Sequence, residues 1–475
     1  MSNAQVTVNE IDFCVPAQKF RFEYSTVEKG GFPFVPEFVL RLLNVSSLMP
    51  EEVAFFFGFT KKELDEALRP FMDNNDIEYK PDGRVALTLQ GCRYFDSGSD
   101  EPLLTQVQIY RQSNIFDLLS FTPIAEEEQT SFSSILSLVL EAGADDRSNS
   151  EMLARKAFQH HFYDLWKERA ARLKIKHADA EIYKISEVRK DRDLWARNSE
   201  DFVLNLDTML VEGKAQSKMA NEEAYLQQQA NALAQRIGSD NTADVASLAT
   251  EFKDESTLSA LHSEGVNFST MIAFGGQALS GNERLERRIL GSLTIKTNQD
   301  ILAETLGKHL KAISKEQSCD ICELRWVAPV NSFWGSSERY KACLSLLSNA
   351  ENGVGKKAEK KIINTKLYIP LASDRDFSTA RKWRASFRDF DNHLFAFVES
   401  RAIAPVEFIV LSNRFALVLY HLIQPDNYPV PVPFGFITEN LEKVMEIEKF
   451  LNGALSQYTE GLEPRDLGKI TEMIG

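Results

Sequence analysis

The last third of the chain alternates between apolar, strand-like runs and helical stretches, and this alternation restricts the fold more than any other feature. The runs are CELRWVAPV, TKLYIPL, HLFAFVES and VEFIVLSNRFALVLYHLI, and the helical stretches cover residues 337–350, 379–389 and 439–455. Continuous apolar strands that alternate with helices are typical of a sheet covered on both faces. We therefore expect an α/β layer with a largely buried sheet over residues 319–475.

Local signals near the N-terminus indicate three helices followed by a hairpin. PEFVLRLLN and PEEVAFFFG each begin with a proline, and Thr60 with Glu63 forms a capping box for KKELDEALRPFMDNN. The turn PDG at residues 81–83 joins two β-prone runs. This order resembles bacterial winged-helix domains, so we interpret residues 1–100 as a winged-helix domain with an N-terminal extension.

The middle of the chain, residues 101–318, is expected to be mostly helical with some strands. Helices are predicted over residues 151–174, 219–238 and 298–315, the last with apolar side chains along one side. In contrast, QVQIYRQSNIFDLLSF alternates like a pair of strands. The fold class predicted for the whole chain is therefore α+β and multidomain.

The order of strands and helices after Glu323 resembles the phospholipase D-like fold. LRWVAPV is similar to that family's early strand, and VEFIVLSNRFALVLYHLI is similar to the strand with its catalytic motif. The resemblance implies a histidine nucleophile, a lysine two residues later and an aspartate five beyond the lysine, followed by a Gly-Ser pair and an asparagine. The residues at these positions are Pro405, Glu407, Ser412, Leu419, Tyr420 and Ile423. The resemblance thus implies a pseudoenzyme domain, in which Glu407 would repel a phosphate.

Two other histidines are candidates for an unconventional active site. His309 and Lys311 have the His-x-Lys spacing, and Glu316 lies five residues beyond the lysine, although all three fall in or beside a predicted helix. His421 lies on a predicted strand. A solvated helix face and a satisfied strand histidine are the simpler interpretations of these positions.

One segment departs from the acidic character of the chain. The whole protein has 54 basic and 69 acidic residues and a net charge of −15, yet residues 356–388 hold ten basic residues against three acidic ones. Within it, ARKWRASFRDF interleaves cations with Trp383 and Phe387, a composition suited to phosphate neutralisation and base stacking. Binding of nucleic acid, binding of an acidic protein, and a solvated loop followed by a helix with core aromatics all remain open.

The predicted recognition helix of the N-terminal module carries no excess positive charge, and residues 34–98 have a net charge of −4. A helix that enters the major groove normally brings excess cations. Protein contact and DNA contact, the latter through Lys61, Lys62, Lys80 and Arg84, are both retained as interpretations. The complete set of candidate nucleic-acid-binding residues is Lys356, Lys357, Lys360, Lys361, Arg381, Lys382, Arg384, Arg388, Lys61 and Lys62.

Composition and motif searches indicate neither a cofactor nor a metal. Cys319 and Cys322 form a single CxxC without a second pair, and the glycines at 275 and 276 lack the rest of a nucleotide-binding loop. No apolar run approaches the length needed to span a bilayer, and five scattered cysteines fit a reducing compartment. We therefore expect a cytoplasmic protein without a membrane partner, cofactor or catalytic residues.

These observations favour a non-catalytic subunit that holds DNA or a partner enzyme through a basic face. The resemblance to multidomain bacterial proteins implies a component of a nucleic-acid-processing or antiphage defence complex, with an ATPase, helicase or nuclease as partner. The alternatives are a phosphodiesterase or nuclease with an unconventional active site, and a winged-helix transcription regulator.

Overall fold

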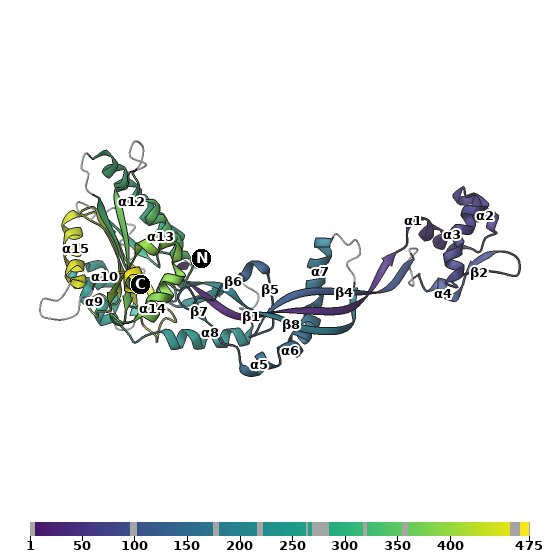
Figure 1. The fold of residues 1–475 in the computed structure, drawn as a ribbon, viewed down its shortest axis with the longest axis horizontal. Helices are drawn as coiled ribbons and strands as arrows, with labels where there is room; N and C mark the ends of the chain where they lie inside the picture. The colour runs from purple at the N-terminus through teal and green to yellow at the C-terminus, as the bar shows by residue number, and fades with distance from the viewer. Residues whose placement is uncertain are drawn as a thin grey trace.

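The computed structural model describes residues 5–95, 102–173, 180–215, 222–262, 265–267, 285–316, 321–353, 360–456 and 466–474. The protein has a mixed α/β fold and is strongly elongated (Figure 1). An α/β body lies at one end, a small helical module, here called the tip module (residues 34–95), lies at the other, and a β-ribbon joins them. Both ends of the chain lie at the body.

The body is built on an eight-stranded mixed sheet with the order β12-β18-β17-β16-β13-β14-β15-β19. β13, β14 and β15 run parallel to one another, and the other neighbours pair antiparallel. The strands are β12 (Glu286–Leu290), β13 (Cys322–Val327), β14 (Ile363–Leu371), β15 (Leu394–Val398), β16 (Val406–Leu411), β17 (Phe415–Leu422), β18 (Val432–Thr438) and β19 (Asp466–Lys469). The apolar runs of the sequence therefore form strands as predicted.

Helices cover both faces of this sheet, because its central strands are buried on both sides. Ile409 and Leu411 of β16 pack into one core, and Phe408 and Val410 pack into the other. The first face is covered by α12 (Lys296–Lys315), α13 (Arg339–Asn349), α14 (Phe377–Ser386), η5 (Arg388–His393) and α16 (Ile470–Met473). The second is covered by α9 (Thr242–Glu251), α10 (Glu255–Ala260) and α15 (Leu441–Leu455), with the short pair β10 (Leu261–His262) and β11 (Gly265–Val266).

The ribbon consists of three long antiparallel strands with β1 in the centre. β1 (Gln5–Gly31) pairs with β4 (Leu103–Asp117) on one side and with β8 (Ala180–Asn205) on the other. Its aromatic side chains, such as Phe22, pack with Phe158 and Trp166 of the helices on one face. The elements that complete this region are β5 (Pro123–Ile124), η1 (Glu126–Glu128), β6 (Gln129–Thr130), β7 (Leu138–Val139), α5 (Ala144–Ser148), α6 (Ser150–His160), α7 (Phe162–Leu173), β9 (Val211–Ala215) and α8 (Glu223–Arg236).

The tip module is inserted between β1 and β4 and has its own apolar core. The predicted helix signals are confirmed: Thr60 and Glu63 form the capping box of α3, and Gly58 ends α2 with a left-handed φ of 70°. The predicted turn lies between the two strands of the hairpin. The elements are α1 (Phe34–Val45), α2 (Pro50–Phe57), α3 (Lys61–Asp73), β2 (Ile77–Tyr79), β3 (Val85–Leu87) and α4 (Leu89–Cys92).

The expected division of the chain differs from the structure at both boundaries. Residues 5–31 form the central strand of the ribbon and are not an extension of the tip module. The boundary at 318/319 separates β12 from the sheet to which it belongs, and it separates α12 from the face of that sheet on which it packs. β4 and β8 give the middle region two long strands beside its helices, because β1 supplies hydrogen-bonding partners that are distant in sequence.

Three smaller predictions in the middle region can be compared directly. The helices expected over residues 219–238 and 298–315 are present as α8 and α12. The helix expected over residues 151–174 is two helices, α6 and α7, which meet at His161. No helix among the described residues is both long and apolar enough to cross a membrane.

Candidate nucleic-acid interface

Helix α14 carries the second cluster of the basic segment. Asp376 begins the helix, and its side chain accepts a hydrogen bond from the Thr379 backbone N–H at 3.1 Å. Arg381 and Lys382 are exposed, and Arg388 is exposed just beyond the end of the helix. We call these three side chains the basic face.

The aromatic residues of this segment do not belong to the exposed surface. Trp383 is 6% exposed and Phe387 is 1% exposed, and both pack in the core beneath α14. The Trp383 ring lies 5.5 Å from that of Trp334. The expectation that these aromatics stack on bases is therefore wrong, because they face the sheet and hold α14 in place.

The other cations of the segment are partly neutralised. Arg384 forms an ion pair with Asp391 at 3.1 Å, and Lys361 forms one with Glu351 at 2.9 Å. Lys360 is exposed. The remaining candidates of the first cluster, Lys356 and Lys357, lie outside the described residues.

The candidates in the tip module lie at the opposite end of the molecule from α14 (Figure 1). Lys61 and Lys62 are exposed in the first turn of α3, and Lys62 lies 3.9 Å from Glu66. Arg84 of the hairpin donates a hydrogen bond to the Ser47 carbonyl. The structure thus does not bring the two candidate cation sets together into one interface.

The positions at which the family resemblance implied catalytic groups are occupied by structural contacts. Glu407 is completely buried, and its Oε1 accepts hydrogen bonds from the indole N–H groups of Trp326 at 2.7 Å and Trp334 at 2.9 Å. Its Oε2 lies 2.9 Å from Nε2 of His421, which is 2% exposed. The expectation that Glu407 repels a phosphate is wrong, because this carboxylate has no access to solvent.

The neighbouring positions have equally local roles. Ser412 donates a hydrogen bond to Glu448 at 2.7 Å, and the backbone N–H of Ile423 donates to Asn241 at 2.8 Å. Tyr420 is fully buried in the sheet. His421 is also held in this buried network and is not presented to a substrate.

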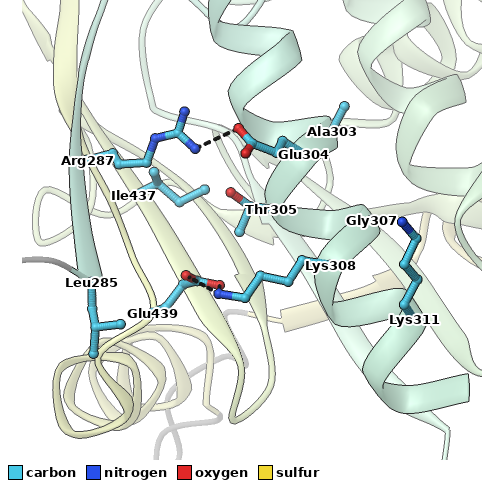
Figure 2. Close-up of a pocket in the computed structure, with 10 residues that line it drawn as sticks. All are labelled: Leu285, Arg287, Ala303, Glu304, Thr305, Gly307, Lys308, Lys311, Ile437 and Glu439. Atoms are coloured by element: carbon cyan, nitrogen blue, oxygen red, sulfur yellow. Dashed lines mark hydrogen bonds and ion pairs between the residues drawn. The ribbon is translucent and has the colours of Figure 1, made fainter. Parts of the chain in front are cut away.

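A hollow of about 560 Å³ lies between β12 and α12, and Figure 2 shows the charged side chains that line it. Arg287 reaches across to Glu304 at 2.8 Å, and Lys308 reaches Glu439 at 2.7 Å. Lys311 lines the same hollow one turn further along α12. Most of the positive charge in this hollow is therefore already compensated by carboxylates.

His309 lies beside this hollow but is turned towards the protein. Its Nε2 lies 2.7 Å from Glu439, and its ring stacks at 5.6 Å from that of Phe415. Burial lowers the pKa of His309, and only 13% of its side chain is exposed. Glu316 forms an ion pair with Arg414, so the proposed His-x-Lys and glutamate set does not form one reactive group.

The open side of the ribbon holds arginines that the sequence did not single out. Arg21, Arg111 and Arg189 come from β1, β4 and β8 and line a hollow of about 530 Å³ with Glu23 and Glu187. The arginines are 71–82% exposed, and each forms an ion pair with a carboxylate. No local sequence signal could have found this set, because only strand pairing brings these residues together.

Buried carboxylates lie where the ribbon joins the body. Glu10 of β1 accepts a hydrogen bond from Ser337 Oγ at 3.0 Å and forms an ion pair with Arg339. Burial raises the pKa of Glu10 to about 7, although Arg339 acts in the opposite direction. Burial also raises the pKa of Asp12, which accepts hydrogen bonds from Ser199 and from the Glu338 backbone. These contacts orient the ribbon on the body.

The described residues contain no group of three or more His, Cys, Asp or Glu side chains arranged to hold a metal ion. Of the CxxC pair, Cys322 begins β13 and Cys319 lies outside the described residues.

Comparisons with known proteins assign no family. No family model and no curated protein matches the chain. Among solved structures, the chain is similar to the archaeal chromatin protein TrmBL2, whose structure shows a mode of DNA binding, with 8% identity and a TM-score of 0.19. That match covers 51% of this chain and 71% of the other, and at this TM-score it carries no argument about fold or function.

Proposed function

We propose that this protein is a non-catalytic scaffold subunit that holds DNA on the basic face of α14 and a partner enzyme elsewhere on its surface. The observation that carries the proposal is the exposure of Arg381 and Lys382 on α14 and of Arg388 just beyond its end, in a segment that buried aromatics fix to the body. Among the described residues, no ion pair involves any of the three. A rigid set of exposed cations is suited to contact phosphates without reading bases.

The scaffold role also draws on the family resemblances. The three helices and hairpin of the tip module are consistent with a winged helix, and helices on both faces of a mixed sheet are consistent with a phospholipase D-like body. At the position where the family resemblance implies a lysine, this chain has the buried Glu407, which accepts hydrogen bonds from two tryptophans. A carboxylate that accepts two indole hydrogen bonds in the core supports stability and supplies no phosphoryl chemistry.

The elongated shape supports a bridging role. A subunit of a nucleic-acid-processing or antiphage defence complex has to hold its DNA and an ATPase, helicase or nuclease at separate places. Here the basic face and the tip module are at opposite ends of the ribbon.

The direct test is DNA binding by the variant Arg381→Glu/Lys382→Glu/Arg388→Glu, measured by fluorescence anisotropy with a 30-base-pair duplex and a 30-nucleotide single strand. Three phosphate contacts predict a slope of about −2.7 for log K against log salt concentration on duplex DNA. The reversal should lower affinity at least about 100-fold at low salt, because three attractions become repulsions. Unchanged affinity would refute the assignment of this surface.

The matched control is Lys61→Glu/Lys62→Glu at the other end of the molecule. If the basic face binds DNA, this control keeps its affinity and the wild type gives no sequence-specific footprint. Loss of binding in the control alone, with a specific footprint, supports the transcription-regulator alternative. Cleavage of DNA that His309→Ala or His421→Ala abolishes supports the nuclease alternative.

A further inference from the structure

The tip module exposes more large apolar side chains than its size explains. Of the twenty large hydrophobic residues that are exposed in the described part of the chain, seven lie between residues 34 and 89. The two at the end of α2 are the most conspicuous, since Phe55 is 91% exposed and Phe56 is 65% exposed. Clustered exposed aromatics of this kind mark interaction sites on soluble proteins.

These two side chains are presented by a rigid base. Phe57 and Phe59 pack partly into the core of the module, with their rings stacked at 5.2 Å. The Phe56 ring lies 5.1 Å from that of Phe57. We call Phe55 and Phe56, supported by Phe57 and Phe59, the phenylalanine pair. The contact with Phe57 restricts the Phe56 ring, which lowers the conformational entropy that this side chain loses when a partner covers it.

The surroundings of the phenylalanine pair are acidic. Glu51 and Glu52 are exposed one helical turn before Phe55 and Phe56, and therefore border them on the surface of α2. Residues 50–66 contain five acidic and two basic side chains, a net charge of −3. One of the two lysines, Lys62, is within ion-pair distance of Glu66.

From this arrangement we infer that the phenylalanine pair docks into an apolar cleft on a partner protein whose rim carries lysine or arginine. Aromatic side chains fill such a cleft, and the acids beside them pair with the rim and exclude the wrong partners. The inference deepens the scaffold function and rests on it for the existence of a partner protein. It does not depend on DNA binding by α14.

Other occupants fit the charges less well. The phosphates of DNA and the headgroups of an anionic membrane would both face the carboxylates of α2. A second tip module would place like charges opposite one another in a symmetric contact. The acidic border therefore favours a basic protein surface over these three.

The experiment uses the full-length protein with a photo-crosslinking amino acid at position 55 in cells, and position 132 as the control. Phe132 is another exposed phenylalanine, at 53%, but lies away from the tip module. The protein captured at position 55 is identified and purified, and its affinity is measured for the wild type, Phe55→Ala/Phe56→Ala and Glu51→Lys. Circular dichroism checks that both variants fold.

The expected result is a crosslink at position 55 that is absent at position 132. Affinity for the purified partner should fall at least about 100-fold in the double alanine variant, since two anchoring aromatics are lost. It should fall about 3-fold to 10-fold in Glu51→Lys, and this second loss should shrink at high salt. DNA affinity should be unchanged in both variants, which separates this inference from the proposed DNA site.

Several results would overturn the inference. No crosslink above the level of position 132, or a crosslink only to a second copy, to nucleic acid or to lipid, excludes a cleft on a partner protein. Equal affinity of the double alanine variant excludes the phenylalanine pair as the anchor. Tighter binding by Glu51→Lys excludes a basic rim.

Discussion

Glu10→Gln should make the protein more stable at alkaline pH, although it removes an ion pair. Glu10 is 3% exposed at the junction of ribbon and body, and burial raises its pKa from 4.5 to about 7 in spite of Arg339. Because the folded-state pKa is raised, the folded protein binds the proton more tightly than the unfolded chain does. The contribution of Glu10 to stability is thus fully present below about pH 4.5 and is lost as pH rises through 7.

The size of this effect follows from the two pKa values. At about 1.4 kcal/mol for each pKa unit, and allowing for partial titration at the ends of the range, stability should fall by about 2.5 kcal/mol between pH 5 and pH 8. The glutamine side chain of the variant would be neutral at every pH and keep an oxygen for the hydrogen bond from Ser337. The variant should therefore match the wild type at pH 5 and exceed it by about 2.5 kcal/mol at pH 8. The attraction of Arg339 is already included in the raised pKa.

Urea unfolding followed by tryptophan fluorescence measures the effect, since Trp326 and Trp334 lie in the body near this junction. The control is Glu304→Gln, at an exposed glutamate whose side chain is 69% accessible. It should change stability by less than about 1 kcal/mol at both pH values. If Glu10→Gln is less stable than the wild type at pH 8 and retains the same pH slope, the attraction of Arg339 outweighs burial and the reasoning is refuted.

Three further substitutions test the contacts that fix the body and the tip module. Glu407→Ala should lower the free energy of unfolding, measured with urea, by about 3 kcal/mol or more, because it leaves the buried donors Trp326 and Trp334 without an acceptor. A smaller loss in Glu407→Ala than in Glu407→Gln would contradict this account. Gly435→Ala should lower the free energy of unfolding by about 2–3 kcal/mol in the same assay, since the new Cβ would lie 1.9 Å from a carbonyl oxygen of β17. An unchanged free energy of unfolding would show that the two strands separate easily. Thr60→Ala should lower the stability of α3, measured by hydrogen exchange, by about 1 kcal/mol, while Thr60→Ser should restore protection, because serine keeps the hydroxyl that accepts the Glu63 backbone N–H.

The features that could be predicted from the sequence are those set by neighbours along the chain. Thr60 and Glu63 are three residues apart and form the cap that their spacing predicts. The central strands of the body are apolar enough to be recognised alone, as in β17, whereas the edge strands β12 and β19 are not. The burial of Trp383 and Phe387 was also readable, since with Ala380 they recur at helical spacing on one side of α14.

The ribbon could not be predicted in this way, because its stability comes from pairing between distant segments. β8 is 26 residues long and rich in charge, and its register against β1 joins residues more than 150 positions apart. The role of Glu407 is equally non-local: its partners Trp326 and Trp334 lie 81 and 73 positions away. From the sequence, Glu407 could only be placed at the lysine position of the resembled family, without either tryptophan partner.

The length of the ribbon makes it possible to distinguish by experiment between two interpretations that the sequence left open. Fifteen residues of β1, from Ala17 to Gly31, pair with β4, and at about 3.3 Å per residue they extend over about 50 Å. That length equals about 15 base pairs of B-DNA at 3.4 Å per base pair. A duplex of ten base pairs held on α14 thus stays well short of Lys61 and Lys62 if the ribbon is straight, and only much longer DNA could contact both ends. A regulator that binds through the tip module and a scaffold that binds through α14 consequently differ in which end of the molecule a short duplex protects.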